Sequence, residues 1–116
     1  MPTTPERRKH TRVLLKTRIV FKPVDSEKEF STDYSENLST NGIFIVTDSN
    51  FEIGTMLELH FSLPNYKKII KVNGKVVWKS TTQRAGKEFA GLGIEFQKID
   101  AESKQIIADY IERTSS

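Results

Sequence analysis

The chain has no cysteine and only two histidines, and this shortage excludes several kinds of chemistry. Without cysteine there is no disulfide bond, no thiol nucleophile and no thiolate metal ligand. His10 and His60 lie fifty positions apart in unrelated contexts, so a zinc or non-haem iron site would have to draw its other ligands from carboxylates. We expect both histidines to be ordinary surface or strand residues, and we expect no metal site.

Recognisable catalytic and cofactor motifs are also missing. The chain has no Gly-x-Ser-x-Gly elbow, no phosphate-binding loop with Gly-Lys-Ser/Thr, no strand-to-helix Gly-x-Gly-x-x-Gly and no His-Glu-x-x-His. Gly91-x-Gly93 falls inside an apparent strand, where glycine indicates close backbone packing or a bulge. The sequence therefore predicts a protein that is not an enzyme and holds no cofactor.

Long apolar runs are absent as well. No stretch approaches the roughly 18 residues of a membrane span, and the amino terminus lacks the apolar core of a secretory signal. We expect a cytoplasmic protein that does not insert into a membrane.

The charge that is present is unevenly distributed. The chain carries 18 Lys+Arg and 15 Asp+Glu, a formal net charge of +3. Residues 1–22 hold seven of the basic residues and one acidic residue, so the remainder is mildly acidic. This asymmetry indicates either an anion-binding arm or a solvated basic tail.

The apolar pattern predicts one mostly β domain. A length of 116 residues suits a single domain, with a flexible lead-in at residues 1–6, the domain at 7–113 and a short tail at 114–116. Alternating or apolar segments bounded by turn residues predict strands at 12–22, 29–36, 43–47, 55–63, 69–79 and 89–97.

Three details of this pattern are informative. Asn73-Gly74 could form a hairpin turn, but the continuous two-residue period favours one long strand with a bend or bulge at Gly74. Residues 80–88 are predicted to be a polar loop, and His60 is predicted to point outward. Asp100 is the expected cap of an amphipathic helix over 101–113, so the chain should form a small antiparallel barrel or sandwich flanked by that helix.

Candidate binding residues gather in two places. Arg7, Arg8 and Arg12 surround the start of the first strand, and a guanidinium group can grip phosphate or the O6/N7 edge of guanine with two hydrogen bonds. The second place is the turn at residues 37–42, where an amide and a hydroxyl can face a purine edge and Gly42 lets the backbone approach the ligand. Asn37-Leu-Ser39 also matches a glycosylation signal, a match we regard as incidental without a secretory signal.

Together the two places resemble the PilZ domain family. The resemblance covers residues 6 to about 112 and rests on Arg-x-x-x-Arg followed by Asn-x-Ser-x-x-Gly, then on Ile43-Phe-Ile-Val, Gly54, Val76-Val-Trp78 and Gly91-Leu-Gly-Ile-Glu-Phe96. It implies a six-stranded antiparallel barrel with a carboxy-terminal helix, and a receptor for the bacterial second messenger cyclic di-GMP.

The resemblance also implies roles for individual residues. Arg8 and Arg12 would clamp phosphate and the guanine Hoogsteen edge, Asn37 and Ser39 would bind guanine, and Gly42 would hold the turn. Auxiliary positions are Arg7 as a phosphate contact, and Lys9, Asn41, Trp78 and Gly91. Asn41 stands where many members have a further glycine, and because asparagine tolerates left-handed dihedrals the turn should survive. Trp78 could equally well be a core residue.

These inferences predict a noncatalytic cyclic di-GMP receptor that relays the signal by a ligand-induced conformational change to a partner protein, with homodimerisation left open. One alternative is a PilZ-like interaction module that binds no nucleotide. Another is a barrel that binds single-stranded nucleic acid on Phe21, Phe44 and Phe61. The spacing of these phenylalanines fits core positions better, and the acidic body would repel a long nucleic acid.

Overall fold

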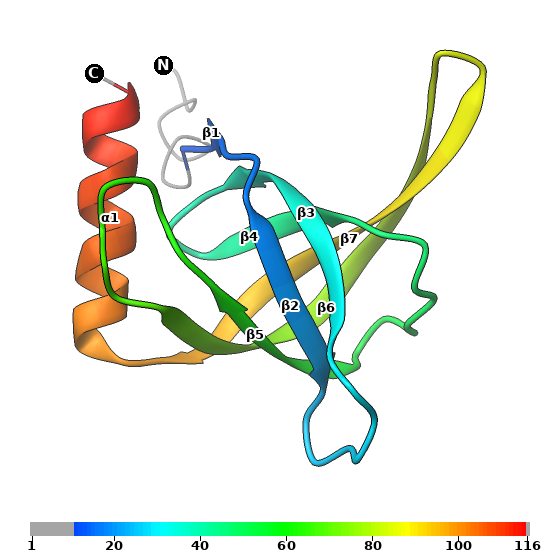
Figure 1. The fold of residues 1–116 in the computed structure, drawn as a ribbon, viewed down its shortest axis with the longest axis horizontal. Coiled ribbons are helices and arrows are strands. Elements are labelled where there is room, and N and C mark those ends of the chain that lie inside the picture. Colours follow the sequence, from blue (N-terminus) through cyan, green and yellow to red (C-terminus); the bar gives the residue numbers. More distant parts are fainter. Residues whose placement is uncertain (1–10, 116) are drawn as a thin grey trace, which may run out of the picture.

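The computed structural model describes residues 11–115, without the side chains of Thr82, Arg84 and Phe89. These residues form seven strands and one helix, shown in Figure 1. In chain order the elements are β1 (Val13–Leu14), β2 (Arg18–Pro23), β3 (Ser31–Leu38), β4 (Gly42–Val46), β5 (Met56–Phe61), β6 (Ile70–Arg84), β7 (Lys87–Ile99) and α1 (Ala101–Ser115).

Six of the strands close into an antiparallel barrel, as predicted. Their order is β3, β2, β5, β6, β7 and β4, and β4 pairs back onto β3 to complete the ring. The short β1 pairs with the end of β3, so that β1 and β2 follow each other along the same edge of that strand. Closure leaves the body of the sheet without an open edge and makes the barrel a rigid platform for its loops.

The single strand predicted over residues 12–22 is wrong, because the ladder is interrupted between β1 and β2. Ser35 of β3 fills the interruption. Its hydroxyl donates a hydrogen bond to the Leu15 carbonyl at 2.5 Å and accepts one from the Thr17 amide at 3.1 Å. The Ser35 hydroxyl therefore adds to the backbone hydrogen bonds that the Leu15 amide donates to Glu36 and the Ser35 amide donates to Thr17. Periodicity does not indicate this buried serine.

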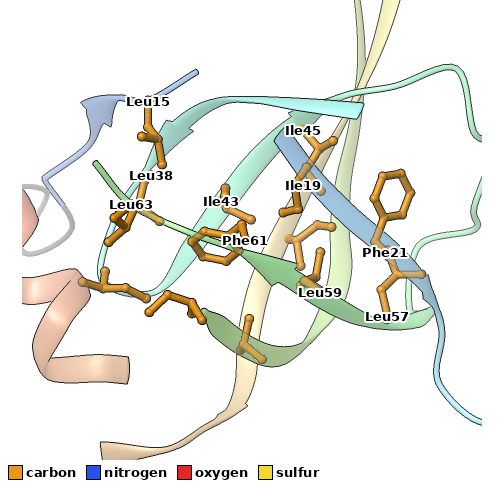
Figure 2. Close-up of a cluster of buried hydrophobic side chains, with 14 of the residues drawn as sticks. Leu15, Ile19, Phe21, Leu38, Ile43, Ile45, Leu57, Leu59, Phe61 and Leu63 are labelled. Carbon is orange, nitrogen blue, oxygen red and sulfur yellow. The ribbon is translucent and has the colours of Figure 1, made fainter. Parts of the chain in front are cut away.

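The core lies inside the barrel and follows the predicted alternation (Figure 2). In β5 the side chains of Leu57, Leu59 and Phe61 are buried, whereas Glu58 and His60 lie on the other face. His60 Nε2 lies 2.9 Å from Glu58 Oε2, so the outward position predicted for this histidine is confirmed.

The long sixth strand is confirmed, including its irregularity at Gly74. The register with β7 shifts between Asn73 and Gly74, and a Cβ added at Gly74 would lie 2.4 Å from Ile94 Cγ2. A side chain at this position would thus overfill the core where the strand bends.

The polar loop predicted at residues 80–88 is wrong. Strands β6 and β7 remain paired as far as Arg84 and Lys87, and their hairpin projects beyond the barrel, drawn in yellow in Figure 1. Ala85 and Gly86 turn the chain with left-handed φ angles of 52° and 78°, respectively. Positive φ at both central residues suits a tight hairpin, but Ala-Gly lacks the asparagine or aspartate that usually signals one.

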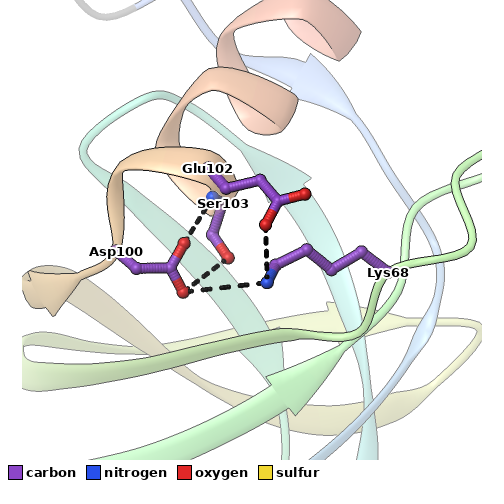
Figure 3. A network of polar contacts seen from close by, with 4 residues as sticks. All are labelled: Lys68, Asp100, Glu102 and Ser103. Carbon is purple, nitrogen blue, oxygen red and sulfur yellow. Dashed lines mark hydrogen bonds and ion pairs between the residues drawn. The ribbon is translucent and has the colours of Figure 1, made fainter.

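The helix closes one end of the barrel and is capped as predicted (Figure 3). Asp100 Oδ1 accepts a hydrogen bond from the Ser103 amide at 2.6 Å, and Lys68 bridges to Glu102 at 3.2 Å. The hydrogen bond from the Ser103 amide lowers the pKa of Asp100 from its ordinary value. The predicted apolar stripe includes the buried Ile107 and Ile111, and the helix continues two residues past the expected end at Arg113.

Candidate functional site

The predicted binding residues divide into two groups. Arg7, Arg8 and Lys9 lie outside the described residues. The others are described and come from the residue before β1, the end of β3, the turn into β4, and the strands β6 and β7. They are Arg12, Asn37, Ser39, Asn41, Gly42, Trp78 and Gly91.

Arg12 and Asn37 are joined directly, although 25 positions separate them in the chain. Arg12 Nη1 donates a hydrogen bond to Asn37 Oδ1 at 2.7 Å, and both side chains lie at the surface of the barrel. The pairing of β1 with the end of β3 makes this contact, since Leu14 lies opposite Asn37 and Arg12 immediately precedes β1. The two motifs found in the sequence therefore meet at one place in the fold.

Ser39 holds the turn together from the inside. It is 1% exposed, and its amide donates a hydrogen bond to the Gly42 carbonyl at 2.9 Å. Its hydroxyl accepts a hydrogen bond from the Asn41 amide at 3.2 Å and donates to the Gly42 carbonyl at 3.4 Å. The hydroxyl is thus engaged in shaping the turn that presents Asn37.

Gly42 has a packing role in addition to those predicted for it. A Cβ added there would lie 2.2 Å from the Ile94 carbonyl oxygen, so glycine allows β4 to approach β7 closely. Neither Gly42 nor Asn41 is among the described residues with positive φ, so the turn makes no use of the left-handed tolerance of Asn41. The Asn41 carbonyl instead accepts a hydrogen bond from the Phe96 amide at 2.7 Å and ties the turn to β7.

An aromatic pair lies on the outer face of the barrel beside this turn. Phe44 alternates with Ile43 and Ile45, which belong to the main core cluster, so Phe44 faces outward, although it is itself buried. Its ring lies 5.3 Å from that of Trp78 between centroids, at an interplanar angle of 49°. Trp78 covers it and remains 54% exposed, which excludes a core position for the tryptophan.

Two glycines make room for this pair. A Cβ at Gly93 would lie 3.0 Å from Trp78 Cε3, and a Cβ at Gly91 would lie 2.2 Å from Phe44 Cζ. Gly91 is therefore covered by Phe44, and it lines a separate groove with Asn50 and Lys79. Of the two glycines, only Gly93 borders the same groove as Arg12 in the described part of the chain.

A groove of about 320 Å³ connects the turn with the tryptophan. It is lined by Arg12, Ser39, Asn41, Gly42, Val77, Trp78, Gly93, Ile94 and Glu95. The sequence analysis names none of Val77, Gly93, Ile94 and Glu95 as a candidate binding residue. The register shift between Val76 and Trp78 turns both Val77 and Trp78 outward, and strict alternation gives no sign of it.

The groove combines three kinds of contact. Arg12 offers a planar set of donors, Trp78 offers an exposed aromatic face, and Glu95 offers a carboxylate whose Oε1 accepts a hydrogen bond from Gln97 Nε2 at 2.8 Å. Together these groups suit a planar, hydrogen-bonding and anionic ligand better than a purely apolar one. Among the described residues, no cluster of three or more His, Asp or Glu could hold a metal ion, and no helix is long and apolar enough to cross a membrane.

Comparison with solved structures gives the same fold. The chain is similar to the inhibitor of motility MotI/DgrA of Bacillus subtilis, with a TM-score of 0.77 and 22% identity over 99% of this chain and 56% of that one. It is also similar to the PilZ domain of YcgR from Escherichia coli solved with c-di-GMP, with a TM-score of 0.77 and 10% identity over 94% of this chain and 92% of that one.

A third similar structure is the complex of MrkH from K. pneumonia with c-di-GMP, with a TM-score of 0.75 and 13% identity. The match covers 91% of this chain and 51% of the MrkH chain. This chain therefore spans about half the length of MrkH and of MotI/DgrA. The search of curated proteins found no match.

The family comparison extends over nearly the whole chain. The model of the PilZ domain matches residues 6–113, which include both motifs, the six barrel strands and most of α1. The chain belongs to the PilZ domain family.

Proposed function

We propose that this protein is a noncatalytic receptor for cyclic di-GMP that passes the signal to a partner protein. The observation that carries the proposal is the bond between Arg12 and Asn37 beside a groove that Arg12 and Trp78 line. Support also comes from the YcgR and MrkH structures, in which a chain of this fold was solved with c-di-GMP.

Arg12 would exchange its hydrogen bond to the Asn37 side chain for hydrogen bonds to the ligand. Its guanidinium donates to Asn37 in the structure described here, and the same donors can grip a phosphate or the O6/N7 edge of guanine. Arg8, three residues before the described part begins, would supply the second guanidinium, with Arg7 and Lys9 as auxiliary cations. Asn37 would then be free to bond the base.

The groove would hold the base between its other walls. Trp78 presents an exposed ring on which a guanine can stack, and Glu95 can accept hydrogen bonds from the guanine amino and imino groups. Ser39 would contribute by keeping the turn in shape, because its hydroxyl is already bonded within that turn. Binding and release need no chemical step, which is consistent with a receptor rather than an enzyme.

The signal would leave the site through β1. Arg12 immediately precedes this strand, which is two residues long and pairs with β3 through Val13 and Leu14. A ligand that draws Arg12 away from Asn37 would act directly on this strand, because Arg12 is bonded to the residue opposite Leu14. A partner protein would respond to this change.

The nucleic-acid alternative lacks its stacking platform. Phe21 and Phe61 are buried in the core, and Phe44 lies beneath Trp78. The alternative of an interaction module without nucleotide is separated from our proposal by direct titration.

Calorimetric titration of cyclic di-GMP into the full chain tests the proposal. A charge-assisted hydrogen bond contributes about 1.5 to 3 kcal/mol, so Arg12→Ala should weaken binding about ten- to a hundredfold. Arg18→Ala is the matched control, because Arg18 is an exposed arginine on β2 that does not line the groove. Absence of heat with the wild-type protein, or equal affinity in both variants, would refute the proposed site.

A further inference from the structure

A second groove, larger than the groove of Arg12 and Trp78, lies along β3. It has a volume of about 570 Å³ and is lined by residues of β1, β3 and β4 and of the segments that follow β1 and β4. It shares no lining residue with the groove of Arg12 and Trp78 among the residues described. The proposed nucleotide site therefore leaves this surface unexplained.

Three apolar side chains from three different strands gather in this groove. Leu14 of β1 is 81% exposed, Tyr34 of β3 is 49% exposed, and Val46 of β4 lies beside them. A single exposed leucine needs no explanation, but apolar groups that converge on one groove from separate strands indicate a contact surface. Since Leu14 and Tyr34 stand open to solvent, the groove suits a segment of a macromolecule better than a small enclosed ligand.

The charges around the groove are mainly acidic. Among the residues that the structure describes, the carboxylates of Asp33, Glu36 and Asp48 line it with the ammonium group of Lys16. Asp33 Oδ2 accepts a hydrogen bond from the buried Thr47 Oγ1 at 2.7 Å, which holds this carboxylate in place at the groove. An acidic rim favours a basic partner and repels nucleic acid and anionic membranes.

The same charges disfavour a symmetric dimer through this surface. In a two-fold interface the same patch contacts itself, so the carboxylates of Asp33, Glu36 and Asp48 would face their own copies. Like charges placed together across an interface oppose association. The complementary occupant is therefore a different protein.

We propose that this groove docks a segment of a partner protein in which apolar side chains are flanked by lysine or arginine. Leu14, Tyr34 and Val46 would bury against the apolar side chains of the segment, and the acidic rim, Asp48 above all, would attract its basic ones. The groove thereby supplies the partner surface that a receptor with no catalytic site needs.

One pairing connects the two grooves. Leu14 lies opposite Asn37 in the β1–β3 ladder, and Asn37 is the residue bonded by Arg12. A change at Arg12 thus reaches the rim of the docking groove within two residues of chain. This regulatory link rests on the proposed function, whereas docking itself does not.

Selection from a displayed library of random peptides on the nucleotide-free full chain tests the docking. Enriched peptides should combine leucine, isoleucine or phenylalanine with lysine or arginine. In titrations with one enriched peptide, Leu14→Ser should weaken binding about ten- to a hundredfold, the loss expected when a leucine is no longer buried. Asp48→Lys should weaken it as well, and Ile53→Ser is the control, since Ile53 is an exposed apolar residue away from the groove.

Several outcomes would overturn the proposal. These are the absence of enrichment, enrichment of acidic peptides, and binding that Leu14→Ser and Ile53→Ser weaken equally. Self-association of the wild type that Leu14→Ser abolishes would assign the groove to a second copy of the chain and would also overturn it.

Repeating the peptide titration with saturating cyclic di-GMP separates this inference from the proposed function. A changed peptide affinity supports the link through β1, and an unchanged affinity contradicts that link. Peptide binding by a chain that shows no heat with the nucleotide would refute the proposed function alone, because docking is measured without nucleotide.

Discussion

Gly42 passes so close to Ile94 that a single added carbon would collide with the backbone. The Cβ of an alanine at position 42 would lie 2.2 Å from the Ile94 carbonyl oxygen, and this oxygen cannot rotate away as a flexible side chain could. The contact ties the turn that carries Asn37 to β7, one of the strands bordering the groove. It gives this glycine a structural role that does not depend on φ.

Gly42→Ala should therefore destabilise the protein and disturb the turn. We expect a loss of about 1 to 3 kcal/mol in the free energy of unfolding, the usual effect of overpacking, measured by urea denaturation. Gly54→Ala is the comparison, because a Cβ there meets no atom within 4 Å and would act only through backbone strain at its φ of 100°. It should leave the amide shifts of the turn at 39–42 unchanged. If Gly42→Ala retained the Ser39 and Asn41 amide shifts of the wild type, the close approach would not determine the turn.

Trp78 is expected to stack on the nucleotide. Stacking of a base on an aromatic side chain contributes about 1 to 3 kcal/mol, so Trp78→Ala should weaken cyclic di-GMP binding about five- to a hundredfold. Binding should also change the fluorescence of this tryptophan, which is the single one in the chain. Phe30→Ala provides an exposed aromatic control away from the groove, and equal effects of the two substitutions would argue against stacking at Trp78.

Glu95 is expected to distinguish guanine from adenine. Its carboxylate can accept hydrogen bonds from the guanine amino and imino groups, which adenine does not present in the same arrangement. Removing the charge would also relieve repulsion of the phosphates, but this relief applies equally to cyclic di-GMP and cyclic di-AMP. The ratio of the two affinities therefore isolates the base contact.

For Glu95→Gln we expect the affinity for cyclic di-GMP, divided by the affinity for cyclic di-AMP, to fall about tenfold. This corresponds to the loss of roughly one charge-assisted hydrogen bond. Calorimetry with both nucleotides measures it. Glu52→Gln, a change in an exposed loop, should leave the ratio as in the wild type. A ratio unaffected by Glu95→Gln would remove this residue from base recognition.

Asp100 should make the helix sensitive to acid. The hydrogen bond from the Ser103 amide lowers the pKa of Asp100 below its ordinary value of 3.8, so the charged cap stabilises the folded chain. This stabilisation is fully present above the unfolded pKa and is lost as the pH falls through the lowered folded pKa. The difference in Tm between wild type and Asp100→Ala should therefore be largest near neutral pH and shrink at acidic pH.

Thermal melts across the pH range measure this difference, with Asp48→Ala as an exposed carboxylate control away from the helix. A difference in Tm that stayed constant down to the lowest pH would mean that the charge of Asp100 contributes nothing to the cap.

Much of the barrel could be predicted because its signals are local. The alternation of Leu57, Leu59 and Phe61 with polar neighbours places β5, and Asp100 marks the start of α1. The features that escaped prediction depend on contacts between distant residues. The Ser35 hydroxyl bonds the backbone where the first strand is interrupted, and a bulge near Trp78 turns two successive side chains outward.

The candidate site shows the same division. The chain contains both motifs in readable form, and the expected neighbours Arg12 and Asn37 can be named from them. The wall of the groove could not be named, since Val77, Gly93 and Glu95 come together only through the register of β6, β7 and β4. The burial of Ser39 likewise follows from the closed turn rather than from its residue type.

The most direct test is a titration of the isotope-labelled full chain with cyclic di-GMP, observed at the Arg12 guanidinium and the Trp78 indole by NMR. We predict that both signals shift together and saturate with the nucleotide, while the guanidinium signal of Arg18 stays in place. Saturable binding that leaves Arg12 and Trp78 unchanged, or no binding at all, would contradict the proposal that the groove between them is the receptor site.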